Sequence, residues 1–358
     1  MVIKRIRGFY SLLFTIIVIA AAGVLFASCG STSGAAGNRP AGPDASGSGT
    51  RRDPFIVASE ASLRKVGSGL DGWTLNAWYR QVANIEMSSG NWKRIGFIAD
   101  NADPGGAFSG VYDGGGFTVS GLDYTVDVVL YDNTDDTEGH GMFGAVASPG
   151  EVKNLTLIGN VAVNIIPGVE EGIGRVVGVG GVVGWLAGGA VENVTFKGSV
   201  RVGDGRTFTD PLGNALSTDY YGHRTGINVG GVVGGVTTAV SRVANCHSEA
   251  IVIGYFQVGG VIGSLENMKQ DANRSFISDN SFTPPETGID GTSFVIMGTN
   301  RVGLVIGNMG DFTTSQRLTS TGNVKQHILA GSYPNHEARN IGGVAGGVIG
   351  RSNGRYFP

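Results

Sequence analysis

The sequence contains only two cysteines, Cys29 and Cys246, and few charged residues. Two cysteines allow at most one disulfide, so a small scaffold held together by several disulfides is excluded. Charged residues make up 15% of the chain, below the usual share of about 25%, which argues against long solvated helices. The formal net charge is −3, and no basic patch predicts a nucleic-acid partner.

Motifs for catalysis and metal binding are also missing from the sequence. The histidines do not have the spacing of metal ligands; they are His140, His223, His247, His327 and His336. No Gly-x-Ser-x-Gly turn with triad partners is present. We therefore expect no metal and no cofactor, and the sequence identifies no catalytic residue.

Two groups of acidic residues keep an enzymatic alternative open. Asp100, Asp103 and Asp113 are carboxylates of the kind that β-helix polysaccharide hydrolases use in pairs. We expect Asp113 to cap a turn instead. Residues 132–138 form an acidic segment whose oxygens could bind Ca²⁺, but its spacing is not that of an EF-hand loop. A solvated loop insertion is the favoured interpretation.

Glycine is the residue that the chain has in excess, with 62 copies. The glycines stand among Val, Ile and Leu, so disorder is not indicated. Glycine disfavours a helix by roughly 1 kcal/mol per residue relative to alanine. The composition therefore predicts an all-β protein with many tight turns. Within it, Cys246 is expected to be a small buried side chain.

The first residues have the pattern of an export signal. Lys4, Arg5 and Arg7 precede an apolar stretch that ends at Phe26-Ala27-Ser28-Cys29. Small residues before a lone cysteine resemble a bacterial lipobox, so residues 1–28 are predicted to be a lipoprotein signal peptide that is removed. Cys29 is then the lipidated residue. An uncleaved transmembrane anchor is the alternative, although the apolar stretch is short for a span of about 20 residues.

A spacer and a large domain are expected to follow the signal. Residues 29–53 are rich in Gly, Ser and Pro, a composition typical of a flexible tether. Residues 54–358 are predicted to fold as one domain. Ser59 to Val66 has a candidate N-cap serine and a short amphipathic pattern, which predicts a helical cap at the start of that domain.

An internal repeat dominates this domain. The phrase Val179-Gly180-Gly181-Val182-Val183-Gly184 recurs with small changes at residues 229–234, 258–263 and 341–346, at irregular spacing. Its expected structural glycines are Gly180, Gly181, Gly184, Gly230, Gly231, Gly234, Gly259, Gly260, Gly263, Gly342, Gly343 and Gly346. Gly141-Met142-Phe143-Gly144 is a degenerate first copy, and Leu304 replaces one glycine in a later copy. Irregular spacing is typical of a solenoid with loop insertions.

A second phrase places an asparagine at the head of an alternating strand after each glycine phrase. The repeat unit is thus interpreted as an apolar glycine-rich strand, a turn and an Asn-headed strand. The asparagines are Asn154, Asn193, Asn245, Asn280 and Asn323. Stacked asparagines form hydrogen-bonded ladders, so we expect an internal ladder at one corner. Together the repeats predict a right-handed parallel β-helix, a β-solenoid, with irregular loop insertions.

These phrases resemble the GLUG motif of bacterial surface proteins. The resemblance extends upstream to Trp78–Val82, Asn91–Gly96 and Phe108–Leu122, and covers roughly residues 54–350. It implies a repetitive, adhesin-like surface protein. GLUG repeats also occur beside the catalytic domain of certain metal-dependent immunoglobulin proteases. This chain has no His-Glu-x-x-His, so that chemistry is not carried over.

The expected function is that of a lipid-anchored binding module of the cell envelope or surface. We expect it to be non-enzymatic and to recognise a glycan or a host or envelope protein through the solenoid face and loops. Loops 201–227 and 266–300 carry aromatic and polar side chains that could contribute. Attachment to the membrane would come through the N-terminal lipid, with the outer membrane or cell surface as the expected location. The alternative is a β-helix carbohydrate-active enzyme, a polysaccharide hydrolase or lyase.

Overall fold

The computed structural model describes residues 46–88, 90–97, 106–129, 137–166, 176–203, 226–237, 240–254, 257–265, 276–287, 294–298, 301–309, 314–321, 323–326, 349–352 and 355–357. The chain divides into two compact units, residues 1–40 and 41–358, and all described residues belong to the second. Cys29, the signal peptide and most of the tether lie outside the described residues. So do Gly342, Gly343 and Gly346.

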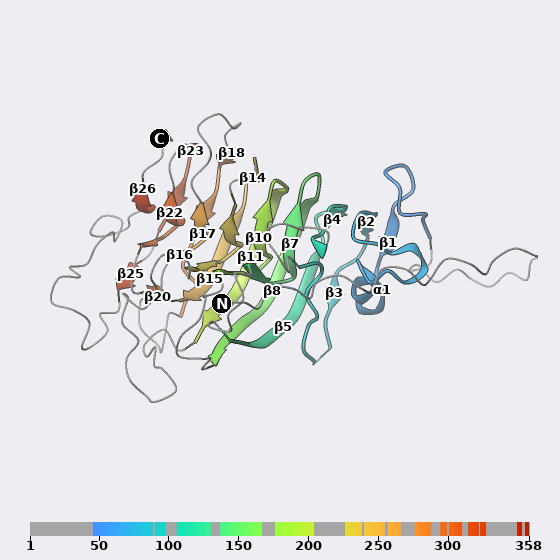
Figure 1. Ribbon diagram of the computed structural model, residues 1–358, viewed down its shortest axis with the longest axis horizontal. Helices are drawn as coiled ribbons and strands as arrows, with labels where there is room; N and C mark the ends of the chain where they lie inside the picture. Colours follow the sequence, from blue (N-terminus) through green and yellow to red (C-terminus); the bar gives the residue numbers. More distant parts are fainter. Residues whose placement is uncertain are drawn as a thin grey trace, which may run out of the picture. The chain divides into compact units, whose positions relative to one another are not determined.

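The fold is all-β, with parallel strands throughout three sheets (Figure 1). The long sheet has sixteen strands: β1 (Phe55–Val57), β2 (Trp78–Gln81), β3 (Ile85–Glu86), β4 (Val111–Asp113), β5 (Thr118–Val129), β8 (Glu151–Ile166), β11 (Ala190–Val202), β14 (Arg242–Ala244), β15 (His247–Ile253), β18 (Phe276–Ser278), β19 (Ser281–Phe282), β20 (Phe294–Gly298), β23 (Thr314–Gln316), β24 (Thr319–Ser320), β25 (Asn323–Gln326) and β27 (Arg355–Phe357).

Two shorter sheets complete the arrangement. The five-stranded sheet holds β6 (Thr137–His140), β9 (Val176–Gly180), β12 (Gly226–Gly230), β16 (Gln257–Gly259) and β21 (Val302–Gly303). The six-stranded sheet holds β7 (Phe143–Ala147), β10 (Val183–Ala187), β13 (Val233–Val236), β17 (Ile262–Leu265), β22 (Ile306–Met309) and β26 (Ile349–Ser352). From β8 to β22 the chain visits the long, five-stranded and six-stranded sheets in that repeating order.

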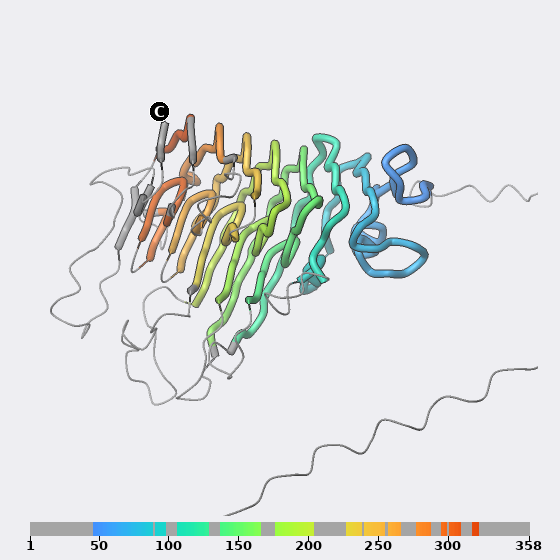
Figure 2. The backbone as a smooth tube through the Cα atoms, turned by 45° about the horizontal axis from the view of Figure 1, so that its top comes forward, coloured from blue at the N-terminus to red at the C-terminus, as the bar shows by residue number. Residues whose placement is uncertain are grey.

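Equivalent residues of successive repeats lie side by side in register, as the predicted β-helix-like arrangement requires. Val179 pairs with Val229, which pairs with Val258. Val183 pairs with Phe143 on one side and with Val233 on the other, so the degenerate first copy also takes its place in the stack. Figure 2 shows the successive layers following the chain order from blue to red.

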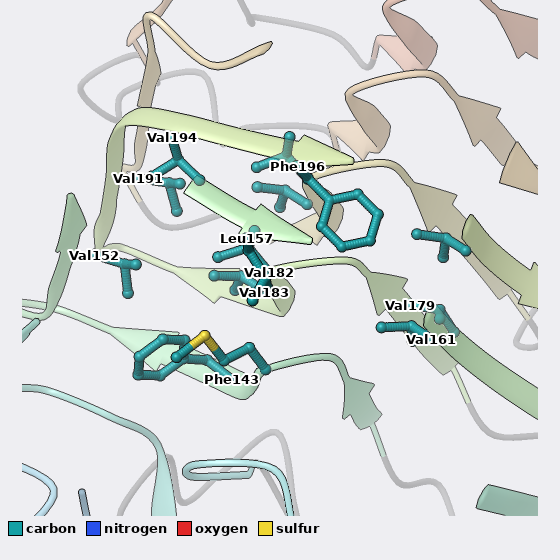
Figure 3. Packing of buried hydrophobic residues seen from close by; sticks show 14 of the residues in the cluster. Phe143, Val152, Leu157, Val161, Val179, Val182, Val183, Val191, Val194 and Phe196 are labelled. Atoms are coloured by element: carbon teal, nitrogen blue, oxygen red, sulfur yellow. The ribbon is translucent and has the colours of Figure 1, made fainter. Parts of the chain in front are cut away.

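Apolar side chains of all three sheets share one core. Each layer sends residues such as Val179, Val183 and Phe196 inward, and their exposed fraction is 0%. Figure 3 shows Phe143, Leu157 and Phe196 packed among the valines that face them. Because each layer buries its valines against the layers above and below, burial of apolar area stabilises the whole stack.

The glycine phrase is a corner and not a single strand, which corrects the expectation. β9 ends at Gly180 and β10 begins at Val183. The glycines here are required by close approach and not by positive φ. A Cβ on Gly181 would lie 2.6 Å from the ring of Phe196, and one on Gly178 would lie 2.5 Å from the carbonyl oxygen of Gly184. Only hydrogen side chains let these backbones come so close.

The start of the stack carries the predicted short helix. Helix α1 (Glu60–Lys65) begins after Ser59, whose hydroxyl accepts from the backbone N–H of Ser62 in a capping box. A 3-10 turn, η1 (Leu70–Gly72), follows. Leu63 of α1 is fully buried in the common core. Phe55 and Trp73, which belong to the same core, stack with ring centroids 4.6 Å apart, so this segment packs on the first layer.

Candidate binding surface

The outer face of β5, β8, β11 and β15 presents polar side chains in straight columns. Exposure alternates along these strands: Leu157 is buried, Ile158 exposed, Gly159 buried and Asn160 exposed. Parallel registration aligns the outward residues of neighbouring strands. One column holds Thr118, Thr156, Thr195 and His247, and another holds Asp123, Asn160, Ser199 and Ile251. Adjacent members of a column are about 4.8 Å apart along the stack.

Hydrogen bonds between strands fix these outward side chains. The Ser199 hydroxyl donates to Oδ1 of Asn160 at 2.7 Å. The Asn164 amide donates to Oδ1 of Asp127 at 2.9 Å. A surface held in this way loses little conformational entropy when a ligand binds.

A lysine and a glutamate on this face form an ion pair. Nζ of Lys197 lies 2.8 Å from a carboxylate oxygen of Glu249. The hydrogen bond from Lys197 lowers the pKa of Glu249 below its usual value, and His247 adds a smaller effect in the same direction. An exposed pair of this kind contributes little to stability. The face therefore offers a ligand mixed hydroxyl, amide and paired charged groups, and no field of one sign.

Three of the predicted asparagines form a ladder at the corner of the long sheet. The Asn193 amide donates to Oδ1 of Asn154 at 3.1 Å, and the Asn245 amide donates to Oδ1 of Asn193 at 3.1 Å. All three residues have φ of 53° or 54°, the left-handed conformation that asparagine tolerates better than most residues. Asn193 and Asn245 are exposed, so the ladder is external and the expectation of an internal one was wrong.

Asn280 and Asn323 do not belong to this ladder. Asn280 is fully buried; its amide donates to the carbonyl oxygen of Val243, and its Oδ1 accepts from the backbone N–H of Cys246. The ladder position in that layer is taken by Asp279, with φ of 58°. Asn323 lies in β25 opposite Phe294, away from the corner.

Charged residues lie at both ends of the ladder, and of these the sequence had singled out Asp113 but not Asp279 or Arg317. Asp113 Oδ1 accepts from the amide of Asn154 at 2.9 Å and from the backbone N–H of Gly115 at 3.0 Å. Asp113 therefore caps a turn, as predicted. At the other end Asp279 pairs with Arg317, whose φ is 49°. The hydrogen bond from Arg317 lowers the pKa of Asp279 to about 2.

A buried polar cluster lies at the first layer of the five-stranded sheet. Nδ1 of His140 lies 2.9 Å from Nη1 of Arg94 and 2.8 Å from the hydroxyl of Tyr124. A guanidinium only donates, so Nδ1 accepts and the ring proton of neutral His140 is on Nε2. That nitrogen is 3.6 Å from Glu138. Burial raises the pKa of Tyr124 to about 12. These contacts join the segment around Arg94 to β6, which is a structural role.

The remaining candidates are buried or lie outside the described residues. Cys246 is fully buried, as expected, and desolvation raises the pKa of its thiol to about 12. Within the described ranges, no group of three His, Cys, Asp or Glu side chains could hold a metal ion, and no helix is long and apolar enough to cross a membrane. Several candidates are not among the described residues: Asp100, Asp103, residues 132–136, His223, His327 and His336. The same holds for residues 204–225 of loop 201–227 and for residues 266–275, 288–293 and 299–300 of loop 266–300.

Comparison with known proteins supports the resemblance found in the sequence. Residues 177–201 match the family model of the GLUG motif. They span β9, the glycine corner, β10 and Asn193 with most of β11. The matched residues therefore form one complete corner together with the ladder residue Asn193. The predicted GLUG repeat is confirmed.

Two further proteins are similar to the chain. Halomucin from Haloquadratum walsbyi is 32% identical over 160 residues, which cover 43% of this chain and 2% of Halomucin. The chain thus matches a very small part of that relative. A crystal structure of a "putative immunoglobulin A1 protease" from Bacteroides ovatus covers 80% of this chain and 86% of its own, with 16% identity and a TM-score of 0.39. Such a score does not establish a common fold.

Proposed function

We propose that this GLUG-motif chain is an exported, lipid-anchored binding module of the cell surface, adhesin-like and non-enzymatic. It binds a glycan or a protein of the host or envelope. The observation that carries the proposal is the rigid, in-register polar face of β5, β8, β11 and β15. Hydroxyl and amide groups held by neighbouring strands suit recognition of a large, uncharged or weakly charged surface.

The proposal includes a right-handed parallel β-helix for the repeats. The chain passes from the long sheet through the two shorter sheets and back to pair in parallel with its previous strand. Parallel connections of this kind are right-handed in about 98% of cases. A closed coil of this hand would make each outward column continuous along the stack.

Surface location is proposed on three grounds. The first is the export signal with the lipidation candidate Cys29. The second is the GLUG motif at residues 177–201. The third is similarity to a protein named Halomucin, although only over 2% of that protein's length. The outer membrane or cell surface is the location that fits these features best, and the membrane contact would be the lipid alone.

The proposal is tested with the chain from residue 29 onward, carrying Cys29→Ser so that it stays unlipidated. Binding is measured on arrays of glycans and of extracellular-matrix and envelope proteins. We expect binding to at least one ligand, weakened tenfold or more by Thr195→Arg or Ser199→Arg, which place a bulky cation on the polar face. Val240→Arg is the control, since Val240 is exposed and lies outside those four strands.

Two results would contradict the proposal. One is the absence of any bound ligand on both arrays. The other is cleavage of a polysaccharide by the purified chain, which would support the hydrolase or lyase alternative.

A further inference from the structure

A hollow lies where the cap meets the first layer of the stack. It has a volume of about 420 Å³, within the range of small-molecule sites, roughly 300–1,000 Å³. Its lining consists of two segments far apart in the sequence: Gly67, Ser68, Gly69, Thr74, Leu75 and Asn76 from the cap, and Ala107 and Ser109 from the first layer.

Hydrogen bonds hold the two walls in fixed positions. The backbone N–H groups of Ser109 and Gly110 both donate to the carbonyl oxygen of Leu75, at 2.9 Å and 2.8 Å. On the cap side, the Tyr79 hydroxyl donates to the carbonyl oxygen of Thr74 at 2.6 Å and accepts from the N–H of Gly67 at 3.3 Å. The hollow is therefore formed before any ligand arrives, and a ligand would not have to order it.

The lining carries no charged side chain. The lining residues carry the hydroxyls of Ser68, Thr74 and Ser109, the amide of Asn76, and the apolar side chains of Leu75 and Ala107, of which Ala107 is 3% exposed. Because no charged side chain lines the hollow, an anion or cation would find no counter-charge among the lining residues. It suits an uncharged ligand that shows both C–H and O–H groups.

The polar groups are already oriented. Thr74 Oγ1 donates to Oδ1 of Asn76 at 2.6 Å, which leaves the Asn76 Nδ2 hydrogens for an acceptor. The Ser68 hydroxyl accepts from the N–H of Leu70 at 3.2 Å and keeps its own hydrogen to donate. Among the described residues, Asn76 Nδ2 and Ser109 Oγ have no hydrogen-bond partner. The residues that line the hollow thus carry donor groups and hydroxyls that are free to bond a ligand.

We propose that this hollow binds one neutral sugar unit of a glycan. The sugar's C–H groups would pack on Leu75 and Ala107, and its hydroxyls would bond to Asn76 and Ser109. The inference rests on the proposed binding function and specifies its ligand as an uncharged saccharide. The hollow would be a second binding site, separate from the polar face.

The experiment uses the unlipidated chain from residue 29 onward with neutral methyl glycosides and linear neutral oligosaccharides. Binding is followed by calorimetry and by saturation-transfer NMR. We expect binding that weakens about tenfold in Asn76→Ala and in Ser109→Ala, the loss of one hydrogen bond of about 1.4 kcal/mol in each case. Ser109→Thr keeps the hydroxyl and should retain most of the affinity. Thr283→Ala, an exposed threonine elsewhere, should bind as the parent does.

The outcomes separate this inference from the proposed function. If no neutral saccharide binds while a protein or charged glycan does on the arrays, the hollow is not a sugar site and the binding module remains. If a neutral saccharide binds but Asn76→Ala and Ser109→Ala bind it equally well, the inference is overturned, and Thr195→Arg and Ser199→Arg then test whether the polar face is the site. Thermal melting of each variant shows that it is folded before its affinity is compared.

Discussion

At the scale of single residues, the residue size that fits at a core position depends on the side chain that faces it across the core. Gly181 faces the ring of Phe196, and Gly260 faces the ring of Phe282. In the next layer Leu304 stands in the glycine column, and Ser320 stands where the phenylalanine would be. In these three layers a large residue on one wall faces a small residue on the other, which keeps the interior filled, whereas in the layer of Ser248 two small residues, Gly231 and Ser248, face each other.

Gly181→Ala should destabilise the fold. Its Cβ would lie 2.6 Å from Phe196 and 2.4 Å from the carbonyl oxygen of Gly231, and overpacking of this kind costs about 1–3 kcal/mol. Leu304→Ala makes the opposite change in the same column, because it leaves a cavity where a fully buried side chain was. It should lower the free energy of unfolding by about 2–5 kcal/mol. Urea unfolding measures both. Parental stability in Gly181→Ala would contradict the close approach.

Ser248 shows the cost of an unpaired polar atom in the same column. It is fully buried between the layers of Phe196 and Phe282, and its hydroxyl has no partner among the described residues. Ser248→Ala should raise the free energy of unfolding by about 1 kcal/mol, because the unsatisfied hydroxyl is removed. Ser264→Ala is the control: that hydroxyl accepts from the Asn308 amide at 3.1 Å, so its loss should lower stability. Equal effects at both positions would refute this account.

At the scale of secondary-structure elements, the corner ladder decides how each long strand begins. β8 and β11 each contain a left-handed asparagine near their start. The side-chain amide of each asparagine donates a hydrogen bond to the previous layer. The left-handed backbone of the same residue changes the direction of the strand. The ladder therefore links conformation within a strand to registration between strands.

Asn193→Ala should be less stable than Asn193→Gly. Both variants lose the bonds to Asn154 and Asn245, but alanine also carries the left-handed penalty of roughly 1–2 kcal/mol. Asp123→Ala, at an exposed strand position of the outer face where no side-chain bond to another described residue is lost, should change stability by less than about 0.5 kcal/mol. Denaturant unfolding of the three variants gives the order. A glycine variant as unstable as the alanine variant would show that the backbone conformation is not what matters.

Helix α1 is attached to the following segment by one carboxylate. Glu60 accepts from the backbone N–H of Ser88 at 2.9 Å and pairs with Arg64. The Ser88 N–H, above all, lowers the pKa of Glu60 from 4.5 to about 2. A lowered pKa gives stability that is present above pH 4.5 and is lost as the pH falls towards 2.

Melting temperatures between pH 5 and pH 2 test this contact. The parent should lose more stability on acidification than Glu60→Gln, since the variant has no carboxylate to protonate there. Glu86→Gln removes a carboxyl from the neighbouring strand β3 and should follow the parent. Identical pH profiles for the parent and Glu60→Gln would rule out the contact as a source of acid sensitivity.

At the scale of the whole molecule, one core runs through successive layers from Phe55 at the cap to Leu318. Each layer contributes a few buried valines and receives the same from its neighbours, so stability accumulates with the number of layers. The positions of the strands, and with them the outward columns, are set by packing in the core beneath the outer face.

Attachment to a membrane is a prediction about the first part of the chain. With lipidation at Cys29, cells fed a labelled fatty acid should yield labelled protein in the membrane fraction. Cys29→Ser should lose the label and partition into the aqueous phase, while Cys246→Ser should keep the label if it is expressed. A labelled Cys29→Ser variant would disprove the assignment, and an unlabelled parent in the membrane would indicate an uncleaved anchor.

The sequence by itself determined the parallel stacking of layers, because recurring Val-Gly-Gly phrases predict equivalent neighbours and the register follows from them. It also determined the capped helix after Ser59 and the turn at Asp113, since both depend on local hydrogen bonds. The tertiary structure alone decided which residue takes the left-handed corner. Asp279 does so and Asn280 does not, because a shift of one residue moves a side chain from the surface into the core.

Only the tertiary structure could show why the repeat glycines are required and where the hollow lies. The glycines are set by atoms of other layers, and the hollow is lined by residues 67–76 and 107–109, which the cap brings together. Local preference acts over a few residues, so it specifies turns, caps and strands. Space between distant segments is fixed only when the layers pack.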